Sequence, residues 1–270
     1  EVNAAVANVK DMSSGATGSI RLGPEAGSVG QQNSTVAIGN WAGKEGQSLY
    51  GVSMGYFAGQ LNQSSYAVAV GGACGQISQG QSAVSLGFQS GNSNQSSYAV
   101  AVGASAGQTG QGQYAVAVGN ESGKESQSSY AVAVGNKAGQ TLQGENAVSI
   151  GRDAGFSNQS QYAVAVGTSA GQTGQGDNSL ALGREAGKNN QATDSIALGP
   201  FSGYTGQGEG CVAIGGSAAY SNQPDFSLVI GYDTSAIASK EISIGKSDYT
   251  VKIGDGNVQS VSDARDKYDI

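Results

Sequence analysis

The stretch Ala131-Val132-Ala133-Val134-Gly135 decides the fold of this chain, because its pattern recurs at a constant spacing over most of the sequence. We call Gly135 and its equivalents the index glycines. A second glycine, here Gly139, follows four positions after the index glycine, and a glutamine, here Gln143, follows eight positions after it. The fourteen index glycines are Gly23, Gly39, Gly55, Gly71, Gly87, Gly103, Gly119, Gly135, Gly151, Gly167, Gly183, Gly199, Gly215 and Gly231. An uninterrupted period of this kind is typical of solenoids, in which each repeat forms one turn of a winding.

The four residues before each index glycine alternate small and aliphatic side chains, which predicts a half-buried β-strand. We expect the aliphatic pair, such as Val100 and Val102, to point into the coil and the alanines and serines to face outward. The small residue three positions after the index glycine, for example Ala42 or Ala170, fits a second inward-facing segment. The sequence thus predicts coils made of two short strands and two turns.

The predicted fold class is all-β: a parallel β-roll or β-solenoid with 16-residue coils and a length of about 65 to 70 Å. Glycine is expected at the corners because tight turns need positive φ or close backbone passage. One coil buries too few aliphatic side chains to offset the entropy lost on ordering its residues. We therefore expect stacked coils and an oligomer in which the alanine faces of several chains pack together.

Composition narrows the possible functions of the chain. It has 270 residues and 12% charged residues, against roughly 25% in ordinary globular domains, and its formal net charge is −7. This charge offers no basic surface for nucleic acid, and no apolar run reaches the ~18 residues of a membrane span. With no histidine and no cysteine cluster, neither a metal nor a cofactor is expected. Cys74 and Cys211 occupy small-residue positions of the repeat, which predicts buried packing residues.

The segment Ser34–Gly43 and its thirteen relatives resemble the head repeats of trimeric autotransporter adhesins, the YadA-like heads. The resemblance extends from Ser19 to about Ser235, and it implies a left-handed parallel β-roll that assembles as a homotrimer. This chain departs from the family in length, because the adhesin heads mostly use slightly shorter coils. The constant period of 16 therefore implies a longer loop in each coil.

The last nine residues, Ser262–Ile270, resemble the opening of the endosialidase-type intramolecular chaperone that ends many phage and giant-virus fibres. In that family the chaperone domain drives trimerisation and then cuts itself off within a Ser-Asp pair, using a serine and a lysine five residues later. Ser262 and Lys267 match that spacing. The resemblance assigns them self-cleavage in a longer precursor, because a neutral lysine can activate a serine hydroxyl.

The repeat and the two resemblances together divide the chain into four parts. Residues 1–18 form an N-terminal linker or short helical cap, and residues 19–235 form the solenoid. Residues 236–261 form a C-terminal β cap or neck, because the interval between repeats shortens from 16 to 14 there. Residues 262–270 begin the chaperone domain.

Tyrosine recurs five positions before the index glycine, and these side chains are expected to stack into a ladder. The positions are Tyr50, Tyr66, Tyr98, Tyr114, Tyr130 and Tyr162. The ladder has two interpretations. The first is structural, either stacking or a subunit contact; the second is glycan binding, since an aromatic ring offers sugars a flat apolar face. The glutamines are expected to hydrogen-bond from coil to coil. Acidic residues are scattered singly over different coils, so the pair that a glycosidase needs is not evident and no enzyme is predicted.

The sequence therefore favours a structural and adhesive segment of a trimeric viral attachment fibre, such as a tail fibre, on the virion surface or otherwise extracellular. Its expected partners are two further copies of itself and a host cell-surface glycan or protein. The alternative is the head domain of a bacterial adhesin on the outer cell surface. An ice-binding solenoid would need a flat face of repeated threonines, which the repeat does not supply.

Overall fold

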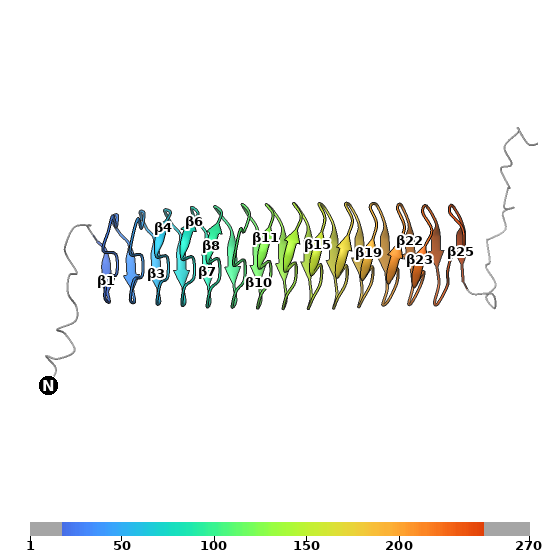
Figure 1. Ribbon diagram of the computed structural model, residues 1–270, viewed down its shortest axis with the longest axis horizontal. Coiled ribbons are helices and arrows are strands. Elements are labelled where there is room, and N and C mark those ends of the chain that lie inside the picture. Colours follow the sequence, from blue (N-terminus) through green and yellow to red (C-terminus); the bar gives the residue numbers. More distant parts are fainter. Residues whose placement is uncertain (1–17, 246–270) are drawn as a thin grey trace, which may run out of the picture.

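The computed structural model describes residues 18–245, which form one straight rod of stacked coils (Figure 1). All regular elements in this range are short β-strands of three residues each. Every strand pairing in it is parallel. The predicted β-solenoid with 16-residue coils is confirmed.

The first sheet, here called sheet A, contains fifteen strands and contributes one strand to each coil. In spatial order its strands are β1 (Ile20–Leu22), β2 (Val36–Ile38), β3 (Val52–Met54), β5 (Val68–Val70), β7 (Val84–Leu86), β9 (Val100–Val102), β10 (Val116–Val118), β12 (Val132–Val134), β14 (Val148–Ile150), β16 (Val164–Val166), β18 (Leu180–Leu182), β20 (Ile196–Leu198), β22 (Val212–Ile214), β24 (Leu228–Ile230) and β25 (Ile242–Ile244).

The second sheet, sheet B, lies on the other side of the coils and ends each strand on the repeated glutamine. Its strands are β4 (Leu61–Gln63), β6 (Ile77–Gln79), β8 (Ser93–Gln95), β11 (Glu125–Gln127), β13 (Thr141–Gln143), β15 (Ser157–Gln159), β17 (Thr173–Gln175), β19 (Asn189–Gln191), β21 (Thr205–Gln207) and β23 (Ser221–Gln223). Single bridges through Thr109 join β8 to β11 across one irregular coil. The second strand of the coil therefore lies at the glutamine, and not at the small residue after the index glycine, which belongs to a turn.

Register follows the sequence period along the whole rod. Val116 of β10 pairs with Val132 of β12, sixteen residues later, and the same offset holds for the other coils of sheet A. At the end Leu228 of β24 pairs with Ile242 of β25, an offset of fourteen. The described part of the expected C-terminal cap thus extends sheet A by one strand. Residues 1–17 of the expected linker and residues 246–270 lie outside the described range.

The interior of the coils reverses the prediction about side-chain direction. Alanines such as Ala101 and Ala117 are fully buried, whereas the flanking aliphatics are only half-buried and Leu86 remains 45% exposed. The expectation that the aliphatic pair points inward was therefore wrong, and so was the expectation that alanine faces are free to pack against other chains. The reason is space: a glutamine side chain from sheet B fills each coil, so only alanine, serine or a similarly small residue fits opposite it.

The glutamines form a continuous amide ladder inside the rod. From Gln31 to Gln175 each side-chain Nε2 donates to the Oε1 of the next glutamine, over distances of 2.9 to 3.3 Å. The Gln111 amide also donates to the backbone carbonyls of Val100 at 2.9 Å and Ala115 at 3.4 Å, which connects the two sheets. The expected hydrogen bonding from coil to coil is confirmed.

The two repeated glycines have different steric reasons. At Gly71, with φ of 133°, a Cβ atom would lie 2.6 Å from the carbonyl oxygen of Gly87 in the next coil. At Gly75, with φ of 48°, it would lie 2.7 Å from the amide oxygen of Gln79. Real Cβ atoms do not approach so closely, so the first glycine allows the coils to stack and the second leaves room for the glutamine ladder.

Non-glycine residues also occupy left-handed conformations in three columns along the rod. Examples are Tyr114 with φ of 59°, Glu121 with φ of 55° and Leu142 with φ of 55°. Side chains with a Cβ pay roughly 1 to 2 kcal/mol for this region, and asparagine or aspartate tolerates it best. Asn94 and Asn158 stand at the position equivalent to Leu142, in keeping with that preference.

Both cysteines are free and fully buried, as expected for packing residues. Burial raises the pKa of the Cys74 thiol to about 12, from an ordinary value of 9.0, against a smaller lowering by a hydrogen bond with its own backbone. The thiol also donates a hydrogen bond to the carbonyl oxygen of Gly71 at 3.1 Å. The thiol form is therefore favoured at neutral pH.

Gln111→Leu tests the amide ladder. This change removes two links of the ladder and leaves the carbonyl oxygen of Val100 and the amide oxygen of Gln127 without their partner. We expect the free energy of unfolding to fall by about 2 to 4 kcal/mol, measured by urea denaturation with circular dichroism.

Gln223→Leu is the matched control for this measurement. Gln223 lies beyond the ladder, where its amide oxygen is buried without a hydrogen-bond partner, and its Nε2 bonds only to backbone carbonyls. Its replacement should cost less than half as much as that of Gln111. Equal losses at the two sites would contradict a stabilising role for the continuous ladder.

Cys74 should resist thiol reagents at pH 8 in the folded protein and react rapidly once urea unfolds it. The folded state holds the thiol proton more tightly than the unfolded state, so this contribution to stability is complete below about pH 9 and is lost as the pH rises from 9 to 12. A Cys211→Ala background isolates the signal, because alanine occupies that repeat position in many coils. Rapid labelling without urea would show that the thiol is accessible.

Candidate functional site

The six tyrosines of the ladder project from one corner of the rod, where sheet B leads into sheet A. Their exposed fractions range from 43% at Tyr98 and Tyr114 to 55% at Tyr66, and all adopt left-handed backbone conformations. This conformation recurs at every coil of the corner, so successive side chains at the position lie above one another. The backbone register thereby places the tyrosines in one column.

The predicted stacking of the tyrosines is confirmed in two runs. The ring centroids of Tyr50 and Tyr66 are 4.9 Å apart, with planes inclined by 20°. In the second run Tyr114 lies 5.0 Å from Tyr98 and 5.1 Å from Tyr130. The column is interrupted at Ser82 and Asn146, so the sixth tyrosine, Tyr162, stands apart from both runs.

Stacking limits how the ladder could bind a sugar. Within each run, a tyrosine ring turns its faces toward the neighbouring rings, and its edge and hydroxyl remain on the outside. A sugar that packs its C–H face on an aromatic ring needs an uncovered ring face. Such faces occur where a run ends, and not at the middle of a run such as Tyr114.

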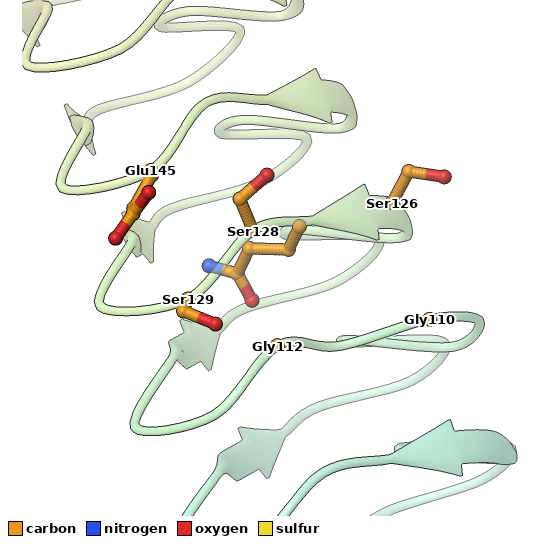
Figure 2. A pocket seen from close by; sticks show the side chains of 7 residues that line it. Gly110, Gly112, Ser126, Ser128, Ser129 and Glu145 are labelled. Carbon is orange, nitrogen blue, oxygen red and sulfur yellow. The ribbon is translucent and has the colours of Figure 1, made fainter.

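Two open polar hollows lie beside the tyrosine corner. One, of about 450 Å³, is lined by Gly110, Gly112, Ser126, Gln127, Ser128, Ser129 and Glu145. Figure 2 shows that Ser129 and Glu145 occupy the same corner of successive coils. The other, of about 490 Å³, is lined by Ser48, Ser64, Ser65, Tyr66, Gln81 and Ser97. Both hollows present hydroxyl and carbonyl groups capable of hydrogen bonding to polar ligands.

Two further aromatic clusters carry cations. Near the N-terminal end, the Lys44 ammonium lies 4.3 Å from the ring centroid of Trp41, which packs edge-on against Phe57 at 4.8 Å. Near the other end, the Lys188 ammonium lies 5.2 Å from the ring of Tyr204. Such contacts add about 0.5 to 1 kcal/mol at exposed sites.

Lys188 is the most strongly held cation of these clusters. The carboxylate of Glu185 accepts a hydrogen bond from its ammonium at 2.8 Å, and this bond raises the pKa of Lys188. The Tyr204 ring, which touches the lysine, stacks in turn on Tyr220 at 4.7 Å. The cluster is thus internally satisfied and serves to bind neighbouring coils together.

Sequence reasoning missed these clusters, although a signal for them exists. Lys188 and Tyr204 are sixteen residues apart, so the repeat alone places them on adjacent coils. The two hollows were also missed.

The singly scattered acidic residues have separate local partners. Glu121 accepts a hydrogen bond from Gln140 at 2.6 Å, Asp153 lies 3.5 Å from Arg152, and Glu25 lies 3.8 Å from Lys44. Within residues 18–245, no group of three or more histidine, cysteine, aspartate or glutamate side chains could hold a metal ion. Ser262 and Lys267, the predicted self-cleavage pair, lie outside the described residues.

Among the described residues there is no helix of the length and apolarity needed to cross a bilayer. Comparison with protein-family models, with curated proteins and with solved structures finds no match to this chain. Function must therefore be argued from the geometry of the rod itself.

Proposed function

We propose that this chain is a structural and adhesive segment of a trimeric viral attachment fibre that binds the host surface. One observation carries the proposal: an unbroken aliphatic strip runs along the outer face of sheet A for the whole described rod. We define this outer strip as the first and last residue of every strand of sheet A.

All positions of the outer strip are valine, isoleucine, leucine or methionine, and none of them is buried. The exposed fraction reaches 68% at Ile242 of the terminal strand and 45% at Leu86 within the rod. Fifteen strands at a spacing of ~4.8 Å give the strip a length of about 67 Å. Monomeric soluble proteins rarely leave a continuous apolar surface of this extent in water, so the strip is a subunit interface.

Further copies of the same chain are the partners that fit this strip. A partner must present a flat apolar surface that keeps step with the coil spacing over the full length, and another copy in parallel orientation does so at every level. The strip is only two side chains wide. Three such strips can therefore converge on one axis parallel to the rod, which gives a closed homotrimer in which equivalent residues meet at equal height.

A rod of this kind suits attachment because it holds low-affinity binding sites at a distance from the virus particle that carries them. Three parallel chains present each surface site three times, and multivalency can raise overall avidity by 10² or more without a new contact. The proposed location is therefore the virion surface or the extracellular space, with a host glycan or protein as the target. Left-handed winding is proposed from the resemblance to YadA-like heads.

The head of a bacterial trimeric adhesin is the alternative function. The stretch Ser262–Ile270 favours the viral fibre, because it resembles the start of an intramolecular chaperone. The gene sequence beyond Ile270 distinguishes the two: a chaperone domain indicates the fibre and a membrane anchor indicates the adhesin. In the viral case we propose Ser262 and Lys267 as the pair that cleaves the precursor.

The trimer is tested by placing charge on the outer strip. The double variant Val118→Lys, Val134→Lys puts ammonium groups on two successive strands, and burial of unpaired charge should abolish the trimer mass measured by light scattering. The control Thr109→Lys, Glu125→Lys adds lysines to successive coils at exposed positions on the sheet B side, and it should remain trimeric. A monomeric native chain, or a trimer that survives the strip variant, would contradict the proposal.

Attachment is tested by adsorption of the fluorescently labelled protein to panels of intact bacterial and eukaryotic cells. We expect saturable adsorption to at least one cell type, and a loss of at least about 10²-fold in apparent affinity for any strip variant that remains folded as a monomer. Circular dichroism checks that the variant keeps its β-structure. Adsorption to none of the cells, or equal adsorption of monomer and trimer, would argue against an attachment fibre.

A further inference from the structure

We infer that the first interruption of the tyrosine ladder, at Ser82, is a binding slot for one pyranose ring whose hydroxyl groups are all equatorial. The slot lies between the rings of Tyr66 and Tyr98 and opens beside the hollow of about 490 Å³. This inference rests on the proposed attachment function and names the class of ligand that it would recognise.

The backbone at the interruption is the same as in the ladder. Tyr66, Ser82 and Tyr98 have φ values of 61°, 55° and 62°. Their amide N–H groups donate to the carbonyl oxygens seventeen residues earlier, at 2.9, 3.0 and 2.8 Å. Ser82 therefore occupies the regular ladder position, and what is missing there is one phenol ring.

The missing ring leaves a space of suitable height. Neighbouring rings of the ladder are 4.9 to 5.1 Å apart, so the centroids of Tyr66 and Tyr98 are separated by about 10 Å, two coil spacings. A six-membered ring placed midway would lie about 5 Å from each phenol, within the range of favourable stacking. The two ring faces that border this space are ends of runs and are not covered by another tyrosine.

The rim of the space is polar. Ser64, Ser65, Gln81 and Ser97 line the adjoining hollow. The hydroxyl oxygen of Ser97 accepts the N–H of Gln81 at 3.2 Å, so its own hydrogen can still be donated to a ligand. Gln81 is exposed and can both donate and accept.

The hollow opens at the corner between the two sheets, and none of its lining residues belongs to the outer strip. Ser48, Ser64 and Gln81 belong to the corner that follows sheet B, whereas the strip consists of residues of sheet A. A trimer whose contacts are confined to the strip leaves this corner open to a ligand.

A ligand for the slot needs two apolar faces and a hydrogen-bonding edge. A pyranose with all-equatorial hydroxyls has this form, since its C–H bonds point to both faces and its hydroxyls lie around the rim. An axial hydroxyl would direct a polar group against one of the tyrosine rings. The slot should thus prefer sugars of the β-glucose or N-acetylglucosamine type over those of the galactose or mannose type.

The second interruption, at Asn146, provides a natural comparison. Asparagine is larger than serine and occupies part of the space between Tyr130 and Tyr162. Beside it the amide of Gln161 already bonds to the carboxylate of Glu145 at 3.4 Å, which engages the polar rim. The binding slot is therefore assigned to Ser82 and not to Asn146.

The experiment titrates the intact oligomer with methyl β-glucoside and methyl β-galactoside, which differ only at the C4 hydroxyl, and follows ligand signals by nuclear magnetic resonance. We expect saturable binding of the glucoside at one site per chain and at least about fivefold weaker binding of the galactoside. Ser82→Tyr fills the slot with the residue of the regular ladder, so it should abolish binding without loss of the fold.

Tyr114→Ser supplies the converse test, because it opens a second slot between Tyr98 and Tyr130. We expect two glucoside sites per chain in this variant. Binding unchanged by Ser82→Tyr, or a site number unchanged by Tyr114→Ser, would overturn the inference. Binding of phenol in place of the glucoside would assign the slot to aromatic ligands instead. If neither ligand binds, Ser82 does not form a binding slot; the cell-adsorption experiment then still tests the attachment function separately.

Discussion

The chain of glutamine amides inside the coils is the interaction on which the rest of the structure depends. From Gln47 to Gln175 each amide bonds to the next glutamine and to a backbone carbonyl of sheet A, so polar groups along this stretch that would otherwise be buried without partners are satisfied. The amide also occupies the volume of the coil. This explains why alanine and serine line the opposite wall and why a glycine stands four residues before each repeated glutamine from Gln31 to Gln207.

The solenoid consequently has an unusual distribution of side chains. Its narrow interior holds amides and small residues, and its larger aliphatic side chains lie on the outside of sheet A. In a common globular domain the larger apolar side chains form the core. In the proposed trimer, extensive apolar burial would take place between chains, which would make the stability of the rod depend on its assembly.

Much of the fold follows from the sequence, because the 16-residue period sets the register directly and alternation of Val132 with Ala133 requires a strand. Alternation shows that a strand has two different faces but does not tell which one faces inward. Which face points inward depends on the burial of Gln143 and its equivalents, and polar amides are not usually expected in a protein core. Left-handed conformations at residues such as Leu142 were also beyond prediction, since neither leucine nor tyrosine signals positive φ.

The candidate site was predictable in part for a related reason. The recurrence of tyrosine at positions such as Tyr98 and Tyr114 predicts a column of rings, and these rings stack as expected. Ser82 departs from the tyrosine pattern, and the space that it leaves can be recognised as a candidate binding slot only when the ring spacing and the adjoining hollow are known.

The constant register of the coils makes them interchangeable units. Insertion or deletion of one complete repeat would change the reach of the rod by ~4.8 Å while every other coil kept its contacts above and below. Duplication within the gene could therefore lengthen the rod in equal steps and shift the height at which a feature such as Ser82 is presented. The number of coils thus sets the length of the rod, and the position of one altered repeat sets the height of the feature that it carries.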